Sequence, residues 1–220
     1  MPEVRPKMAP SVGPSMPILT YPLERIDFRP WACSLLGVER LEDLHLRPDP
    51  VRFAHYGKRM NYYARLLASN FGLVTDRYLQ LADLVAPLFD GIVLRQRLPT
   101  FRCHLAGAGQ ISGFHRDGDP EYKITPGVIN AWVPLTTVSG SNSIYIESKV
   151  GSQDHRPVSL RPGEMLIFDA YHLSHGSHRN ETHSTRVSFD FRFLPNNPAR
   201  ARELGIRATE PRDERESARS

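Results

Sequence analysis

Residues 185 to 194 alternate between polar and apolar side chains, and this pattern constrains the fold more than any other feature of the sequence. Successive side chains point to opposite faces of a β-strand, so the run predicts a strand with one polar and one apolar face. The polar face carries Arg186, Ser188, Asp190 and Arg192, and the apolar face carries Val187, Phe189, Phe191 and Phe193. The aromatic face must pack on another layer, for which helices are the natural partner. The polar face either lines a cavity or faces water.

The part of the chain after Gly91 has the character of a mainly β protein. Short apolar runs alternate there with glycine, proline, serine and asparagine, which favour turns. Besides the alternating run, the predicted strands are Phe101–Leu105, Val128–Leu135, Ser143–Glu147, Pro157–Leu160 and Glu164–Phe168. Many short strands separated by turns are typical of a β-sandwich or a β-barrel.

Two helices are predicted before these strands, over residues 51–70 and 76–89. Apolar residues recur in both segments at helical spacing. Gly57 is unfavourable inside the first helix, whereas Pro87 should kink the second helix or end it early, and Gly91 should stop it at the latest. We expect both helices to pack on one outer face of the β-structure.

The length of the chain suits one domain with flanking segments. A chain of 220 residues can bury one sizeable core. Seven of the first 30 residues are prolines, which rules out a long helix or a central strand there. We therefore predict an extended arm over 1–30, a single domain over 31–195 with its helices at about 51–90, and a charged, solvated tail over 196–220.

Composition excludes several classes of function. Lysine and arginine number 28 and aspartate and glutamate 24, so the net charge is 28 − 24 = +4. This mild charge, without a basic block, argues against nucleic acid as a partner. There is no apolar run long enough for a bilayer and no signal-like N-terminus, so we expect a cytoplasmic protein without membrane contact. Cys33 and Cys103 are too few for a disulfide framework and are expected to be ordinary thiols.

The histidines suggest a metal site. His115 and Asp117 are two residues apart, so on an extended segment an imidazole and a carboxylate point to the same side. Alone, this pair could equally be a solvent-exposed turn. His175 follows an apolar run and would supply a second imidazole. Two histidines and one carboxylate form the facial triad of non-haem Fe(II) oxygenases, which leaves three metal positions open.

Arg186 and Ser188 form a candidate carboxylate-binding pair beside the predicted metal site. Arg186 lies 11 residues after His175 (186 − 175) and shares the polar face of its strand with Ser188. The planar guanidinium group matches a carboxylate, and the hydroxyl group adds a hydrogen bond. A cavity with iron at one end and this pair at the other would fit a dicarboxylate. By itself, Arg186 would more often be a surface salt-bridge residue.

With these residues in this order, the chain resembles the Fe(II)/2-oxoglutarate-dependent dioxygenase superfamily over roughly Phe101 to Phe193. Three stretches resemble the phytanoyl-CoA-dioxygenase-like branch of this superfamily. A fourth stretch resembles the short oxygenases of aminoglycoside and orthosomycin antibiotic pathways, of the streptomycin and hygromycin B kind. The stretches are Phe114-His115-Arg116-Asp117, Asn130-Ala131-Trp132-Val133-Pro134-Leu135, Gly163-Glu164-Met165-Leu166-Ile167-Phe168 and His175-Gly176-Ser177-x-x-Asn180.

The resemblance implies a double-stranded β-helix, a cupin-like jelly roll with the metal inside one open end. It also implies Fe(II) bound by His115, Asp117 and His175, 2-oxoglutarate bound through Arg186 and Ser188, and dioxygen as the oxidant. Hydroxylation or oxidative cyclisation, including orthoester formation, is the implied reaction. Related halogenases replace the carboxylate ligand with a small residue, so the presence of Asp117 disfavours halogenation.

Further site residues are expected around this centre. Asn130 and Trp132 lie on one face of a predicted strand and either contact 2-oxoglutarate or simply belong to the core, and Ser112 precedes the first ligand closely enough to reach it. Acidic and aromatic residues near the mouth suit a sugar or aminocyclitol-type small molecule such as a glycoside. The candidates for contact with this substrate are Asp119, Tyr122 and Glu147.

Two other functional classes share much of this pattern. A metal-dependent cupin enzyme that does not use 2-oxoglutarate would have the barrel and the histidines without needing the arginine–serine pair. A non-catalytic carbohydrate-binding jelly roll would have structural histidines and would bind no iron. The sequence leaves the oligomeric state open.

Overall fold

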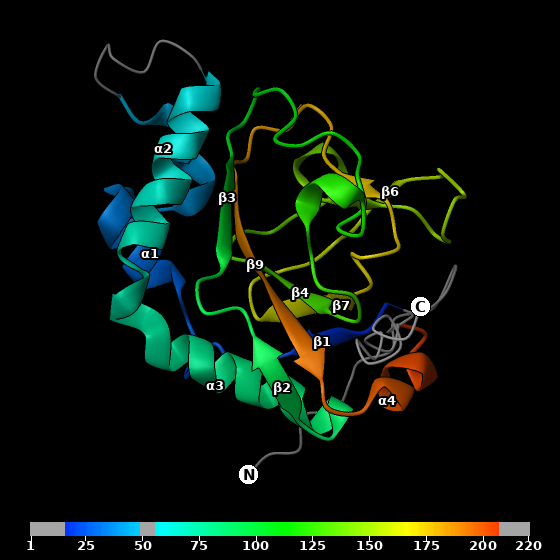
Figure 1. The fold of residues 1–220 in the computed structure, drawn as a ribbon. Coiled ribbons are helices and arrows are strands. Elements are labelled where there is room, and N and C mark those ends of the chain that lie inside the picture. Colours follow the sequence, from blue (N-terminus) through cyan, green and yellow to red (C-terminus); the bar gives the residue numbers. More distant parts are fainter. Residues whose placement is uncertain (1–15, 49–55, 207–220) are drawn as a thin grey trace.

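The computed structural model describes residues 16–48 and 56–206 of the chain. After one short strand, three helices precede most of the strands along the chain, and a fourth helix follows the last strand (Figure 1). The helices are α1 (Arg29–Leu36), α2 (Tyr56–Ser69), α3 (Thr75–Val85) and α4 (Pro198–Glu203), with 3₁₀ turns at Leu41–Leu46, Phe71–Val74, Ala86–Phe89, Pro120–Tyr122 and Gly140–Asn142. The strands are β1 (Ile18–Thr20), β2 (Ile92–Arg95), β3 (Thr100–His104), β4 (Ile129–Pro134), β5 (Tyr145–Ile146), β6 (Arg156–Pro157), β7 (Glu164–Phe168), β8 (His175–Gly176) and β9 (Arg186–Pro195).

Two antiparallel sheets form the body of the protein. The larger sheet has the order β1-β7-β4-β9-β2, with β3 also paired to β9, and the smaller sheet has the order β6-β5-β8. Neighbours such as β4 and β7 are far apart in sequence, which is how a double-stranded β-helix is wound. The predicted fold class, mainly β with flanking helices and a cupin-like jelly roll, is therefore confirmed. Each of the six predicted strands overlaps an observed strand, although β5 and β6 are only two residues long and the predicted strand Pro157–Leu160 shares only Pro157 with β6.

Strand β9 has the two faces that its sequence predicts. Its aromatic side chains are buried, and helical segments cover that side of the larger sheet in Figure 1. Ring pairs that join the strand to these segments are Phe28–Phe189 at 5.1 Å, Tyr78–Phe191 at 5.2 Å and Phe89–Phe193 at 5.2 Å between centroids. Such pairs stabilise by about 0.5–1.5 kcal/mol each beyond the burial of apolar area. The prediction that helices pack on one outer face is confirmed.

The two predicted helices correspond to α2 and α3. Helix α2 ends at Ser69, and the predicted start of this helix, residues 51–55, lies outside the described part of the chain. Helix α3 ends at Val85, and a tighter 3₁₀ turn that contains Pro87 runs from Ala86 to Phe89. Proline lacks the N–H that would continue the α-helix, so the predicted early end has its expected cause.

The packed domain includes part of each predicted flanking segment. Residues 16–30 of the predicted arm are packed on the domain, since β1 pairs with β7 and both Leu19 and Phe28 are buried. The predicted tail begins with helix α4, whose Ala201 is buried. The remaining parts, 1–15 and 207–220, lie outside the described residues.

None of the helices in the described part of the chain is long and apolar enough to cross a membrane.

Candidate metal centre

The two histidines of the predicted triad are tied together through their main chains. His115 and His175 form an isolated antiparallel bridge in which each N–H donates to the other carbonyl, at 3.0 and 2.9 Å. The N–H of Asp117 donates to the Ala170 carbonyl at 2.8 Å, which holds the next turn against the same loop. His115 and Asp117 are two positions apart on this extended stretch, so their side chains point to one side.

The three predicted ligands converge on one point. Suitable ligand atoms of His115, Asp117 and His175 all lie within 4.8 Å of one another, and Asp117 Oδ1 is 3.9 Å from the Nε2 atom of each histidine. Each imidazole donates its Nδ1–H to a carbonyl two residues earlier, Gly113 at 2.9 Å and Leu173 at 3.0 Å. This bonding leaves the Nε2 lone pairs directed at the shared point, as metal ligands require.

The donor set fits Fe(II). Two imidazole nitrogens and one carboxylate oxygen suit a divalent iron that keeps open positions, whereas a structural zinc site would use four ligands. Burial lowers the pKa of His175 to about 4, because it outweighs the hydrogen bond to the Leu173 carbonyl and the charge of Asp117, which both raise that pKa. The imidazole is therefore neutral at physiological pH, which is the form that binds a metal.

The second carboxylate oxygen of Asp117, Oδ2, accepts a hydrogen bond from Arg192. Arg192 Nε donates to Asp117 Oδ2 at 2.7 Å, and the carboxylate is almost completely buried. Burial alone would lower the pKa of Arg192, but the hydrogen bond and the charge of Asp117 outweigh it and raise that pKa. Arg192 therefore remains a cation beside the metal ligand.

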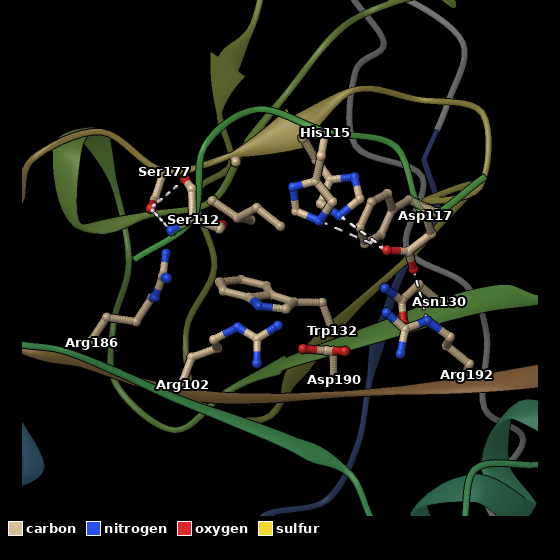
Figure 2. Close-up of a pocket in the computed structure, with 14 residues that line it drawn as sticks. Arg102, Ser112, His115, Asp117, Asn130, Trp132, Ser177, Arg186, Asp190 and Arg192 are labelled. Carbon is tan, nitrogen blue, oxygen red and sulfur yellow. Dashed lines mark hydrogen bonds and ion pairs between the residues drawn. The ribbon is translucent and has the colours of Figure 1, made fainter. Parts of the chain in front are cut away.

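A pocket opens from the triad towards β9, and Figure 2 shows its walls. Polar side chains of the larger sheet line one side, and the triad lies opposite. The lining residues are Arg102, Ser112, His115, Asp117, Asn130, Trp132, Ile144, Phe168, His175, Gly176, Ser177, Arg186, Asp190 and Arg192. The polar face of β9 therefore lines a cavity, which was one of the two possibilities that its sequence allowed.

Arg186 is buried in this pocket with most of its donors unused. Its Nη1 donates to the Asn142 carbonyl at 3.2 Å, and its Nε has no hydrogen-bond partner among the described residues. Its guanidinium carbon lies 5.8 Å from the centroid of the Trp132 ring. Burial, followed by the charge of Arg102, lowers the pKa of Arg186 to about 9, so it is still charged at neutral pH. A buried cation with free donors is suited to an anionic ligand.

The other predicted co-substrate residues belong to the same pocket or lie next to its lining. Asn130, Trp132 and Ser112 line the pocket. Ser188 is fully buried behind the lining, and within the described chain neither its Oγ nor Asn130 Oδ1 has a hydrogen-bond partner. Unpartnered buried polar atoms are costly, so these two oxygens favour the binding of a polar ligand in the pocket.

The predicted substrate residues differ in their positions. Tyr122 is exposed at the rim, with its ring 4.7 Å from that of His115. Asp119 is used locally, since its Oδ2 accepts the N–H of Arg116 at 2.9 Å.

Glu147 does not line the pocket, in contrast to its predicted role. Its carboxylate is completely buried and accepts the main-chain N–H groups of Ser174, Gly151 and Gln153, at 2.8, 3.0 and 3.2 Å. Burial would raise the pKa of Glu147, but these hydrogen bonds and the charge of Arg116 lower it overall. The side chain anchors the loop after β5, so no substrate contact is proposed for it.

The sequence did not assign roles to Arg102, Asp190 and Arg192. Asp190 and Arg192 lie on the predicted polar face of β9, and this shared face could have indicated that they line the same cavity as Arg186. Arg102 pairs with Ser188 across the β3–β9 ladder and therefore points to the same side. That placement depends on strand register, which the sequence of β3 alone does not specify.

The chain is similar to several known proteins. No family model matches the chain. The streptomycin biosynthesis protein StrG of Streptomyces griseus is 35% identical over 178 residues, which is 80% of this chain and 83% of that protein. Among solved structures, the nickel complex of the non-heme monooxygenase ThoJ has a TM-score of 0.43 and 20% identity, over 52% of this chain and 49% of that one. AviO1 of Streptomyces viridochromogenes Tue57 has a TM-score of 0.42 and 21% identity, over 53% of this chain and 57% of that one.

The two kinds of comparison carry different weight. The alignments with ThoJ and AviO1 span only about half of each protein and describe a partial likeness. The match to StrG covers four fifths of both chains at an identity that establishes common descent. The chain therefore belongs to the family of the streptomycin biosynthesis protein StrG.

Proposed function

We propose that this protein is a non-haem Fe(II)- and 2-oxoglutarate-dependent oxygenase that acts on a small molecule. The observation that carries the proposal is the convergence of three ligand atoms from His115, Asp117 and His175, with both imidazoles turned by hydrogen bonds so that Nε2 faces the centre. Bound Fe(II), 2-oxoglutarate and dioxygen would together supply the oxidising power for hydroxylation or ring closure.

The pocket residues would bind and orient the co-substrate. Arg186 offers unfilled, charged donors to the distal carboxylate of 2-oxoglutarate, and its pairing with that carboxylate would compensate the cost of burying the guanidinium group. Trp132 and Phe168 supply apolar walls of the pocket, which would help to exclude water once the ligand is bound. Ser188 and Asn130, which have buried unpartnered oxygens, are proposed to accept or donate hydrogen bonds once the ligand is present.

The proposed substrate is a sugar or aminocyclitol-type intermediate of a natural-product pathway. Support comes from the relative StrG, whose name places it in streptomycin biosynthesis. Tyr122, exposed at the rim beside His115, presents an aromatic face on which a sugar ring or an ammonium group could stack. Asp119, in the same turn, is the candidate for a polar contact.

An anaerobic titration tests the metal and co-substrate together. Adding Fe(II) and 2-oxoglutarate to the protein should produce the weak visible charge-transfer band of the iron chelate. His115→Ala and Asp117→Ala should abolish the band, because each removes one of three ligands. His178→Ala is the matched control: this exposed histidine lies three residues after His175 and contacts Tyr145. Wild-type protein without the band, or full bands in both ligand variants, would refute the proposal.

Two further measurements separate the alternatives. If the protein were a cupin enzyme independent of 2-oxoglutarate, Arg186→Met would leave the Kd for 2-oxoglutarate unchanged. We expect that Kd to rise by about 10- to 100-fold. Substrate class can be tested by comparing amine-bearing sugars with acyl thioesters as stimulators of succinate formation. Stimulation by acyl thioesters alone would contradict the proposed substrate.

A further inference from the structure

Arg192 occupies a position that links the metal ligands to the larger sheet. It lies near the end of β9, on the same face as Arg186, and its cross-strand neighbour on β4 is Asn130. Both of its main-chain groups are held by Gln96, since Arg192 N donates to Gln96 Oε1 at 3.1 Å and Gln96 N donates to Arg192 O at 2.7 Å. The backbone from which the side chain projects is therefore fixed.

The side chain of Arg192 divides the two oxygens of Asp117 between different tasks. Its Nε–H donates to Oδ2 at 2.7 Å, while Oδ1 lies 3.9 Å from the Nε2 atoms of His115 and His175. Figure 2 shows the carboxylate between the histidine pair and the guanidinium group. Only Oδ1 is thus turned towards the point where the three ligands meet.

The division matters for the number of open metal positions. A facial triad leaves three of six positions free only when the carboxylate uses one oxygen. A chelating 2-oxoglutarate would take two of these positions and dioxygen the third. A carboxylate that turned to bind through both oxygens would occupy one of the positions that the reaction needs.

We propose that Arg192 is a positioning residue that holds Asp117 as a one-oxygen metal ligand. This inference rests on the proposed function of the triad. The side-chain hydrogen bond of Arg192 goes to Asp117, so its effect on the metal would be exerted through that ligand. Asp190, two residues earlier on the same face of β9, adds a second carboxylate near the guanidinium group and helps to keep its charge in place.

The competing explanation is a salt bridge that only fastens the loop around Asp117 to the sheet. A purely structural bridge would affect the stability of the metal-free protein but not its affinity for a metal. The two explanations can therefore be separated by a direct measurement of metal binding, with no need for a substrate.

The test uses Mn(II), whose free ion gives a distinct electron paramagnetic resonance signal. Arg192→Met removes every donor while retaining an extended side chain, and we expect the Kd for Mn(II) to rise by about 10- to 100-fold, the usual range for losing a partner of a metal ligand. Arg192→Lys keeps one charged donor, so its Kd should lie between the two. Arg29→Met is the matched control, because it removes a guanidinium group that pairs with a carboxylate, Asp27, outside the pocket, and it should stay within about 3-fold of wild type.

The outcomes distinguish this inference from the function on which it rests. Wild-type protein that binds no Mn(II) contradicts the proposed metal centre itself. Wild-type binding together with an Arg192→Met variant of equal affinity but lower thermal stability overturns the positioning role and leaves the centre standing. If Arg192→Met does not fold, Arg192→Lys decides: a raised Kd supports the role, and a Kd equal to that of wild type overturns it.

Discussion

Lowering the pH should destabilise the protein through His104, and the size of the effect can be worked out from the structure. His104 is completely buried on β3, and its Nε2–H donates to the Gly109 carbonyl at 2.8 Å. Burial, reinforced by the charge of Arg186 opposite it in the β3–β9 ladder, lowers the pKa of His104 from 6.5 to about 4. The folded protein thus holds this ring neutral at pH values where the unfolded chain binds a proton.

The sign and magnitude of this pH effect follow from the linkage between proton binding by His104 and folding. Between pH 6.5 and pH 4 the unfolded state carries more protons, so stability is complete above pH 6.5 and is lost as the pH falls towards 4. A difference of 6.5 − 4 = 2.5 pKa units corresponds to about 3 kcal/mol in total at 1.36 kcal/mol per unit, of which about 2.5 kcal/mol is lost between pH 7 and pH 4.5.

The assay is urea unfolding of wild type and His104→Gln at pH 7 and at pH 4.5. Glutamine can still donate to the Gly109 carbonyl but does not titrate. The free energy of unfolding of wild type should therefore fall by about 2.5 kcal/mol more than that of the variant. Contributions from other groups, including His175, are common to both proteins and cancel. Equal losses in the two proteins would refute the account of His104 as a buried neutral ring.

Three further substitutions have effects that the structure predicts. Gly118→Ala would place a methyl group 2.6 Å from the Tyr171 carbonyl oxygen. The clash should displace the turn next to Asp117 and weaken Mn(II) binding about 10-fold in a titration. Gly113→Ala, which has open space around it, should leave this binding unchanged. Phe191→Ala should lower the free energy of unfolding in urea by about 3–5 kcal/mol, because the ring is completely buried against helix α3. Arg186→Met should raise the Kd for 2-oxoglutarate by about 10- to 100-fold, measured calorimetrically on Mn(II)-loaded protein, while leaving the affinity for Mn(II) unchanged.

Features governed by local periodicity were predictable from the sequence. The alternation in β9 identified both its aromatic face and its polar face, because strand geometry places side chains with a period of two. The end of α3 near Pro87 followed from the chemistry of proline. The convergence of His115, Asp117 and His175 was predicted from the resemblance, since sequence spacing alone cannot bring positions 60 residues apart (175 − 115) into contact.

Features set by tertiary context were not predictable in the same way. Strand β2 is short, and Val93 and Leu94 remain exposed on it, so it lacks the buried alternation that marks a strand. Arg102 joins the pocket only because of its register with Ser188. Glu147 looks like a surface acid in the sequence, yet three main-chain N–H groups compensate its burial.

The reciprocal main-chain bonds between His115 and His175 have a consequence for how the proposed metal centre would bind and release an ion. They close a 60-residue loop (175 − 115) in the polypeptide itself, so the entropy of bringing the two imidazoles together is lost during folding and not during metal uptake. A chelator should accordingly strip the ion and leave the native state intact, unlike a zinc finger, which unfolds without its metal. Protein isolated in the bare form should then take up ferrous iron rapidly and reversibly, without a refolding step.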